Sequence, residues 1–371
     1  MKIIADNTVP FLKGVLEPVA EVTYLDSKEF TSANVKDADA LIIRSIDKCT
    51  RQLLEGSHIR LITTATIGFD HIDAAYCKEA GITWKNAPGC NAASVAQYVL
   101  SSLVVTALKK GERLSDKTIG IIGVGHVGTI VEKLCSAIGM RVLRNDPPRV
   151  EKEGKNGFVS LDTIAKESDI ITLHVPLTKE GRYATHHLAN TAFFTKLARK
   201  PWLINSCRGA VHDTDALLSA KRTGIISELI IDCWENEPSI HLDLLSQASI
   251  GTPHIAGFSA DGKANGTRMC LEQIEKFFGI ALEKLNEVVP PAPLNDEIDL
   301  NTFKDHRIEQ AILYCFNPQL VDQDLRKNTN RFEWLRANYN HPREFKAYKI
   351  LNATREEASI LTSLGFQCPN N

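Results

Sequence analysis

Three short polar stretches carry the side chains that could do chemistry. They are residues 204–209 (INSCRG), residues 232–238 (DCWENEP) and residues 251–257 (GTPHIAG). His254 belongs to a residue type that titrates near neutrality and can accept a proton, and Glu237 could stabilise the charged imidazole. Arg208 offers a planar guanidinium that matches a carboxylate at two points. A base, its acidic partner and a fixed cation together suit the oxidation of a hydroxyl group on an acidic substrate.

Each of these side chains also has an ordinary structural explanation. An arginine after a strand is usually a surface ion pair, and a histidine after a proline is often a loop residue. The chain has eleven histidines, so any single one is more often structural than catalytic. The combination favours function, because each stretch follows a predicted strand of one parallel sheet and ligands bind beyond the carboxyl ends of such strands.

A glycine-rich turn marks the start of that sheet. A short apolar run leads into residues 123–128 (GVGHVG), and residues 127–138 then repeat apolar side chains at helical spacing. Strand, glycine turn and helix in this order are typical of a dinucleotide-binding unit. We expect Gly123 to allow the tight turn, Gly125 to let a pyrophosphate approach the backbone, and Gly128 to let helix and strand pack closely. The positive end of the helix attracts phosphates.

An acidic residue lies where the second strand of this unit should end. Asp146 follows the apolar residues 140–143 and can accept hydrogen bonds from ribose hydroxyls. This position favours NAD over NADP. Arg144 and Arg149 lie close by in sequence, and they weaken that inference because an arginine can accommodate a 2′-phosphate.

Strand and helix signals alternate along most of the chain, which predicts βαβ units in two Rossmann-like, doubly wound parallel-sheet domains. Strands are expected at residues 1–6, 40–44 and 61–64, so that Ser45 and Thr66 lie at strand ends. From spacing alone, both would be read as turn or capping residues. A long helix at 92–109 should lead into the second domain, and a helix at 265–283 should belong to the first. The expected domains are residues 1–92 with 257–285, residues 93–256, and residues 286–371.

The last of these domains differs in composition from the rest of the chain. It follows a stiff, proline-rich linker at residues 289–293 (VPPAP), carries many aromatic residues, and has no glycine before Gly365. About 80 residues form only a marginal core, so a packed partner is expected. We predict a small α+β domain here.

Composition places the chain among ordinary globular proteins. At 371 residues it should form two or three domains, and its net charge of −2 gives no reason to expect binding to nucleic acid or a membrane surface. The nine cysteines are scattered without metal-ligand spacing, and no signal peptide is visible, so reduced thiols and a cytoplasmic protein without a bound metal are expected. The most apolar helix, residues 92–108, contains polar side chains that argue against a membrane span.

The three polar motifs resemble those of the D-isomer-specific 2-hydroxyacid dehydrogenases. Residues 207–209 (CRG), 236–238 (NEP) and 253–257 (PHIAG) match that family's arginine, glutamate and histidine motifs. The resemblance implies an NAD-dependent dehydrogenase with Arg208, Glu237 and His254 as its catalytic triad. It also implies these cofactor contacts: Gly123, Gly125, His126, Val127, Gly128, Asp146, Val175 (through its backbone), Ser206, Cys207, Arg208, Asp232 and Gly257.

Several further stretches resemble one branch of the family, which acts on a small phosphorylated hydroxy acid and pairs two subunits through an extra carboxyl-terminal domain. They are residues 42–45, 65–73, 87–91, 145–149 and 254–258. The likeness implies that Ser45 and Thr66 hold the substrate, against the structural reading above. It also implies a substrate contact at position 258, where the family usually has tyrosine and this chain has Phe258. Without the phenol hydroxyl one hydrogen bond is missing, so either substrate binding is weaker here or another group supplies the contact.

Two alternatives remain open from the sequence. The chain could be another member of the family, acting on 3-phosphoglycerate or on glyoxylate and hydroxypyruvate. It could also be an NADH-sensing binding module with little catalysis, although the presence of all three polar residues argues against that.

Overall fold

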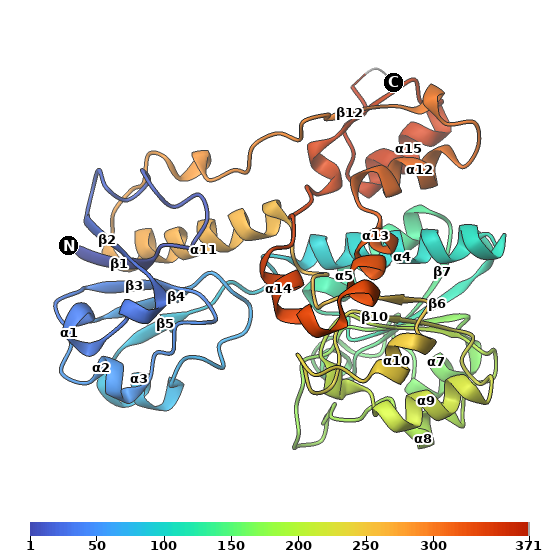
Figure 1. The fold of residues 1–371 in the computed structure, drawn as a ribbon, viewed down its shortest axis with the longest axis horizontal. Coiled ribbons are helices and arrows are strands. Elements are labelled where there is room, and N and C mark those ends of the chain that lie inside the picture. The colour runs from blue at the N-terminus through green and yellow to red at the C-terminus, as the bar shows by residue number, and fades with distance from the viewer. Residues whose placement is uncertain (370–371) are drawn as a thin grey trace. The chain divides into compact units, whose positions relative to one another are not determined.

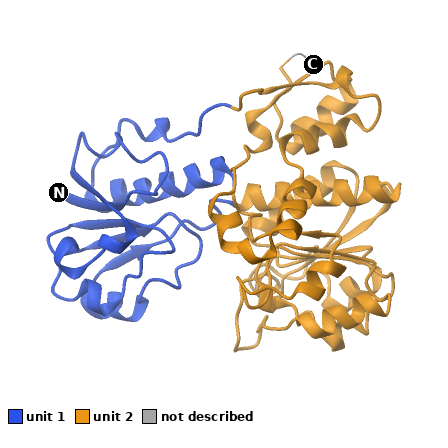
Figure 2. Ribbon diagram, viewed as in Figure 1, with its two compact units in different colours: residues 1–91, 259–292 blue, residues 92–258, 293–371 orange. Residues whose placement is uncertain are grey.

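The computed structural model describes residues 1–369, which form two compact units (Figures 1 and 2). Unit 1 contains residues 1–91 and 259–292, and unit 2 contains residues 92–258 together with the chain from residue 293 onward. The carboxyl-terminal domain expected at 286–371 therefore belongs, from residue 293, to the same compact unit as the glycine turn. Its last two residues, 370–371, lie outside the described residues.

Unit 1 is built on a five-stranded parallel sheet with the strand order β2-β1-β3-β4-β5. The strands are β1 (Lys2–Asp6), β2 (Glu21–Leu25), β3 (Ala40–Ile43), β4 (Leu61–Thr64) and β5 (Thr83–Lys85). The helices are α1 (Ser32–Val35), α2 (Arg51–Leu54), α3 (Ala74–Ala80) and α11 (Ala260–Phe278). Both faces of the sheet are covered, which explains why β3 and β4 are apolar or buried at every position.

The helix α11 closes one face of this sheet although it comes from a distant part of the sequence. Ser259 caps its first turn by accepting a hydrogen bond from the Gly262 amide, and Gly279 ends it in the left-handed conformation. Cys270, Leu271 and Ile274 are buried against the strands. The return of this segment to the first sheet is therefore a packing requirement of unit 1.

Unit 2 contains a six-stranded parallel sheet with the order β11-β10-β9-β8-β6-β7. The strands are β6 (Thr118–Ile122), β7 (Arg141–Asn145), β8 (Ile170–Leu173), β9 (Trp202–Asn205), β10 (Glu228–Ile231) and β11 (Ile250–Gly251). The helices are α4 (Ala92–Lys110), α5 (His126–Ala137), α6 (Pro147–Glu153), α7 (Leu161–Glu167), α8 (Thr191–Phe194), α9 (Thr214–Arg222) and α10 (Leu242–Gln247). The strand order reverses between β6 and β8, and ligands bind at such a switch point.

Helix α4 is long and apolar enough, by length and composition, to cross a membrane. Most of it is buried in unit 2, where Tyr98, Leu100 and Leu103 are almost fully covered. This burial is typical of a core helix.

The carboxyl-terminal part of unit 2 is a small α+β domain. It contains β12 (Glu297–Asp299), α12 (Arg307–Cys315), α13 (Pro318–Lys327), α14 (Phe332–Ala337), β13 (Lys349–Leu351) and α15 (Arg355–Leu364). The strands β12 and β13 pair in parallel. The predicted α/β class with parallel sheets and a small carboxyl-terminal domain is confirmed.

This domain packs on the rest of unit 2 through hydrogen bonds as well as apolar contacts. Asp322 accepts a hydrogen bond from the Gly251 amide at 2.7 Å, and Arg326 donates to the carbonyls of Leu245 and Ala248. Gln97 of α4 bonds the backbone at Phe345. The aromatic residues that gave this segment its distinctive composition, such as Phe316 and Phe345, are buried in the core that it shares with α4 and α5.

Candidate active site

The glycine turn has the geometry expected of a phosphate-binding loop. Gly123 has a φ of 89°, and a Cβ there would lie 2.6 Å from the carbonyl oxygen of His174. A Cβ on Gly128 would overlap the carbonyl oxygen of Gly123, whereas one on Gly125 would meet no atom within 4 Å. Gly123 and Gly128 are therefore required by the fold, and Gly125 leaves open space at the start of α5, where a pyrophosphate would fit.

Asp146 lies at the end of β7 and holds the glycine turn. Its Oδ2 accepts a hydrogen bond from the Val124 amide at 2.8 Å, and its Oδ1 caps α6 by accepting from the Arg149 amide. A carboxylate has further lone pairs, so the group can still accept from ribose hydroxyls. The neighbouring guanidinium groups are both engaged: Arg144 with Glu132, and Arg149 with Glu153. Both arginines near the proposed ribose site are therefore paired within the fold.

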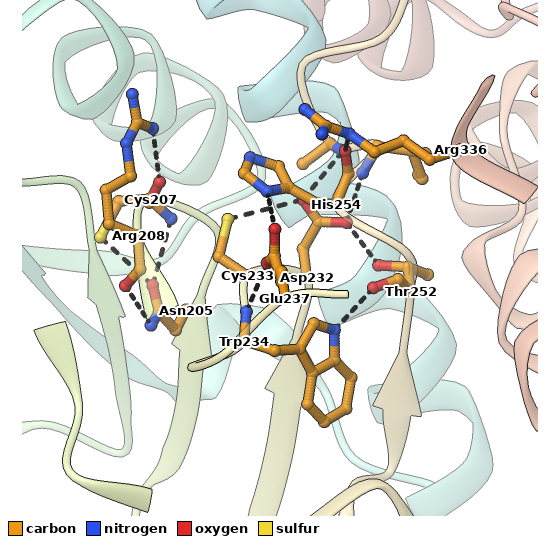
Figure 3. Close-up of polar contacts among 12 residues, drawn as sticks. Asn205, Cys207, Arg208, Asp232, Cys233, Trp234, Glu237, Thr252, His254 and Arg336 are labelled. Atoms are coloured by element: carbon orange, nitrogen blue, oxygen red, sulfur yellow. Dashed lines mark hydrogen bonds and ion pairs between the residues drawn. The ribbon is translucent and has the colours of Figure 1, made fainter. Parts of the chain in front are cut away.

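The imidazole and the carboxylate of the predicted triad form a hydrogen-bonded pair (Figure 3). His254 Nδ1 lies 2.7 Å from Glu237 Oε2, and the other carboxylate oxygen of Glu237 accepts from the Trp234 amide at 2.7 Å. Both side chains are partly buried. With Nδ1 engaged by Glu237, the imidazole presents Nε2 as the free ring nitrogen.

The loop that carries His254 is anchored by Asp232, which is fully buried at the end of β10. Asp232 Oδ1 accepts from the Thr252 hydroxyl at 2.7 Å and from the Ile255 amide at 2.8 Å, while Oδ2 accepts from the Ala256 amide at 3.0 Å. Burial raises the pKa of the Asp232 carboxyl, and these bonds oppose that rise. Asp232, which was predicted to lie near the nicotinamide, thus holds the loop of His254 through three hydrogen bonds.

Arg208 follows β9 and lies in the same region of unit 2 (Figure 3). Its guanidinium donates to the Cys207 carbonyl at 2.7 Å, and its own carbonyl accepts from the Asn205 side chain at 2.9 Å. The guanidinium is largely exposed and can turn toward a ligand. Burial raises the pKa of the Cys207 thiol to about 11, so the thiol is protonated at neutral pH.

The other predicted cofactor contacts lie around the same strand ends. His126 and Val127 begin α5, and Val175 packs beside Gly123. Ser206 is buried, and its hydroxyl has no hydrogen-bond partner among the described residues, which fits a contact that only a ligand would complete. Gly257 follows the two amides held by Asp232.

The predicted substrate residues belong to different units. Ser45 is exposed just after β3 of unit 1. Thr66 follows β4, and its hydroxyl bonds the carbonyl of Gly68 at 2.9 Å and the hydroxyl of Thr64 at 2.7 Å. Both lie at the carboxyl ends of strands, as a ligand site requires. Phe258 belongs to unit 2, where its ring stacks on His341 with the centroids 5.7 Å apart.

Cys233, Glu237 and His254 also place three potential metal ligands within 4.8 Å of one another. Burial raises the pKa of the Cys233 thiol well above its usual value. Because Glu237 and His254 already bond each other, the cluster is better explained as a hydrogen-bonded pair beside a buried cysteine.

Two polar residues in this region escaped sequence reasoning. The first is Tyr98 of α4, whose hydroxyl bonds the Thr252 hydroxyl at 2.8 Å beneath the histidine loop. The second is Arg336 of α14, which donates to the His254 carbonyl at 3.2 Å. No local signal marks either residue, because each reaches the loop from more than 80 residues away.

Comparison with known proteins agrees with this geometry. Residues 95–256 match the NAD-binding domain of D-isomer-specific 2-hydroxyacid dehydrogenases, and residues 288–365 match a domain described as of unknown function. The chain is 52% identical over 367 residues to erythronate-4-phosphate dehydrogenase of Porphyromonas gingivalis W83, covering 99% of this chain and 100% of that protein. This chain belongs to the D-isomer-specific 2-hydroxyacid dehydrogenase family.

More distant relatives extend the match. Erythronate-4-phosphate dehydrogenase of Escherichia coli strain 55989 is 39% identical, over 99% of this chain and 98% of that protein. Among solved structures, D-lactate dehydrogenase of Aquifex aeolicus, complexed with NAD and lactic acid, has a TM-score of 0.59 at 30% identity, covering 79% of this chain and 100% of that one. NAD-bound 3-phosphoglycerate dehydrogenase of Entamoeba histolytica has a TM-score of 0.63 at 27% identity. The match covers 75% of this chain and 95% of that one. The expected family, and with it an NAD-dependent dehydrogenase, is confirmed.

Proposed function

We propose that this chain oxidises 4-phospho-D-erythronate to 2-oxo-3-hydroxy-4-phosphobutanoate with NAD, in the biosynthesis of pyridoxal 5′-phosphate (vitamin B6). The observation that carries the chemistry is the 2.7 Å contact between His254 and Glu237 at the strand ends of the NAD-binding sheet. The substrate follows from the full-length likeness to erythronate-4-phosphate dehydrogenases.

In this mechanism His254 is the general base. Its Nδ1 is held by Glu237, so Nε2 takes the proton of the C2 hydroxyl. The carboxylate of Glu237 stabilises the imidazolium that forms, and the Trp234 amide fixes that carboxylate in place. NAD supplies the hydride acceptor when it is bound.

Arg208 binds the substrate carboxylate and polarises the oxygen at C2 as it becomes a carbonyl. Asp232 keeps the histidine loop in one conformation, so that the imidazole is already placed before the substrate arrives. Ser45 and Thr66 of unit 1, and Phe258 of unit 2, are proposed to contact the rest of the substrate.

The test is a panel of hydroxy acids with NAD, followed by the absorbance of the reduced cofactor. We expect the highest kcat/KM on 4-phospho-D-erythronate, with 3-phosphoglycerate and D-lactate as the comparisons. A higher kcat/KM on 3-phosphoglycerate would reassign the substrate. A protein that binds NADH and turns over none of these acids would instead be a binding module.

We further propose a cytoplasmic homodimer that pairs through the carboxyl-terminal domain. Large apolar side chains are exposed on that part of unit 2, namely Leu294, Tyr314, Leu320 and Trp334. Light scattering on the purified chain should give twice the monomer mass, and charged substitutions at Leu320 and Trp334 should lower it. A monomeric wild-type protein would contradict this assembly.

A further inference from the structure

Arg336 reaches the catalytic histidine from the carboxyl-terminal domain. It lies on α14, and its Nε donates to the His254 carbonyl at 3.2 Å. Its guanidinium carbon lies 5.3 Å from the ring centroid of Phe258. The side chain is therefore held at two points, by a carbonyl of the catalytic loop and by the aromatic face four residues further along that loop.

No carboxylate forms an ion pair with this guanidinium within residues 1–369. The Nε bond occupies one of its five donors and leaves the two terminal nitrogens for a ligand. Fixed, planar and without an acidic partner, this group suits an anion that binds at two points, such as a phosphate.

Figure 3 gives the arrangement around the imidazole. In this view the His254 ring lies between the guanidinium groups of Arg208 and Arg336. The proposed substrate has the same pattern: C2 carries the reacting hydroxyl, the carboxylate is attached on one side, and the phosphate lies on the other side at the end of the C3–C4 chain. With the substrate carboxylate on Arg208, the phosphate end would lie on the Arg336 side of the ring in this view.

We propose that Arg336 binds the phosphate group of the substrate and so selects phosphorylated over unphosphorylated hydroxy acids. The inference rests on the proposed function for the identity of the substrate, and it gives the carboxyl-terminal domain a part in specificity. It also identifies a donor that can stand in for the phenol hydroxyl missing at position 258, because Arg336 packs directly on the Phe258 ring.

The test compares kcat and KM of wild type, Arg336→Met and Arg336→Lys on 4-phospho-D-erythronate and on D-erythronate. Arg336→Met should lower kcat/KM on the phosphorylated acid about 10- to 100-fold, mainly through KM, and change the value on D-erythronate less than about twofold. Arg336→Lys should recover part of the loss, since it keeps the charge without the fork. Inorganic phosphate, used as a competitive inhibitor, should bind Arg336→Met about tenfold more weakly than wild type.

Arg331→Met is the matched control. Arg331 lies five residues earlier and stacks on the exposed Trp334 ring, with its guanidinium carbon 3.8 Å from the ring centroid. We expect its kinetics to match wild type on both acids, and thermal unfolding should show that all three variants are folded.

If Arg336→Met lowers kcat equally on 4-phospho-D-erythronate and on D-erythronate, Arg336 merely supports His254. That result would overturn the inference. Unchanged KM on the phosphorylated acid would do the same. A wild type that is inert on phosphoerythronate but prefers 3-phosphoglycerate to glycerate overturns only the proposed function, and the same variants then test Arg336 on that pair. The proposed function and the role of Arg336 are both overturned if the wild type prefers neither phosphorylated acid to its unphosphorylated counterpart. They are also both overturned if it turns over none of these four acids.

Discussion

At the scale of single residues, the proposed mechanism depends on an imidazole held in one orientation by a carboxylate. His254→Ala should lower kcat by about 10²- to 10⁴-fold, which is the usual contribution of a general base. Arg208→Ala should also remove most turnover, chiefly because the substrate carboxylate loses its bidentate partner. Steady-state kinetics would measure both losses, and His58→Ala, at an exposed histidine of unit 1, is the control. Wild-type turnover in His254→Ala at neutral pH would exclude the assigned base.

A second residue-scale prediction concerns Asp47, which is buried beside Asp6 after β3. Burial, together with the hydrogen bond from the neighbouring carboxyl, raises the pKa of Asp47 to about 6. The folded protein then holds a proton that the unfolded chain has released, so the free energy of unfolding should fall as the pH rises from about 4 to about 6. The fall should not exceed about 3 kcal/mol, the equivalent of two pKa units. Urea unfolding across this range should show it.

Asp47→Asn provides the comparison for that measurement. The amide cannot ionise, so unfolding of this variant should depend less on pH between 4 and 6. An equal slope in the variant and in wild type would assign the effect to other carboxyls.

At the scale of elements, two glycines of the β6–α5 turn have different tasks. Gly128→Ala forces a methyl group into the Gly123 carbonyl, which should cost about 1–3 kcal/mol and lower the Tm as well as NADH affinity. Gly125→Ala meets no atom within 4 Å, so its Tm should stay near wild type while NADH binding weakens. Thermal unfolding and a fluorescence titration with NADH would separate the two. A large loss of Tm in Gly125→Ala would show that its space is needed by the fold itself.

The sequence predicted these elements well wherever the signal was local. The strand at Leu61–Thr64 and the helix from Ala92 were predicted within a residue, because short apolar runs and helical periodicity report directly on buried strands and helices. The glycine spacing likewise predicted the turn and the roles of Gly123 and Gly128. The proposed catalytic residues were singled out because each follows a strand of one parallel sheet.

Contacts between distant segments were not predictable in this way. Nothing near Arg336 indicates that it bonds the loop of His254, and nothing near Asp322 indicates that it caps the Gly251 amide. Asp232 was expected beside the cofactor, but a sequence motif does not say which backbone amides a buried carboxylate will satisfy. Such pairings depend on tertiary packing alone.

At the scale of the whole molecule, the carboxyl-terminal domain belongs to the core of unit 2. Truncation after Ala292 should expose the apolar faces of α4 and α5, where Ile312, Phe316 and Phe345 are buried. We expect the truncated chain to unfold at a lower temperature and to bind a hydrophobic dye. A fragment of residues 1–292 with the Tm of the full chain would show that the domain is an independent appendage.

The discontinuity of unit 1 bears on how the chain is made. Residues 1–91 leave the ribosome first, yet the face covered by Cys270, Leu271 and Ile274 has to wait until some 170 more residues have been synthesised. Until α11 is made, one apolar face of the nascent amino-terminal sheet is therefore exposed. Chaperones are suited to bind such a surface. Unit 2 is completed later still, because the carboxyl-terminal domain that covers α4 and α5 is synthesised after α11.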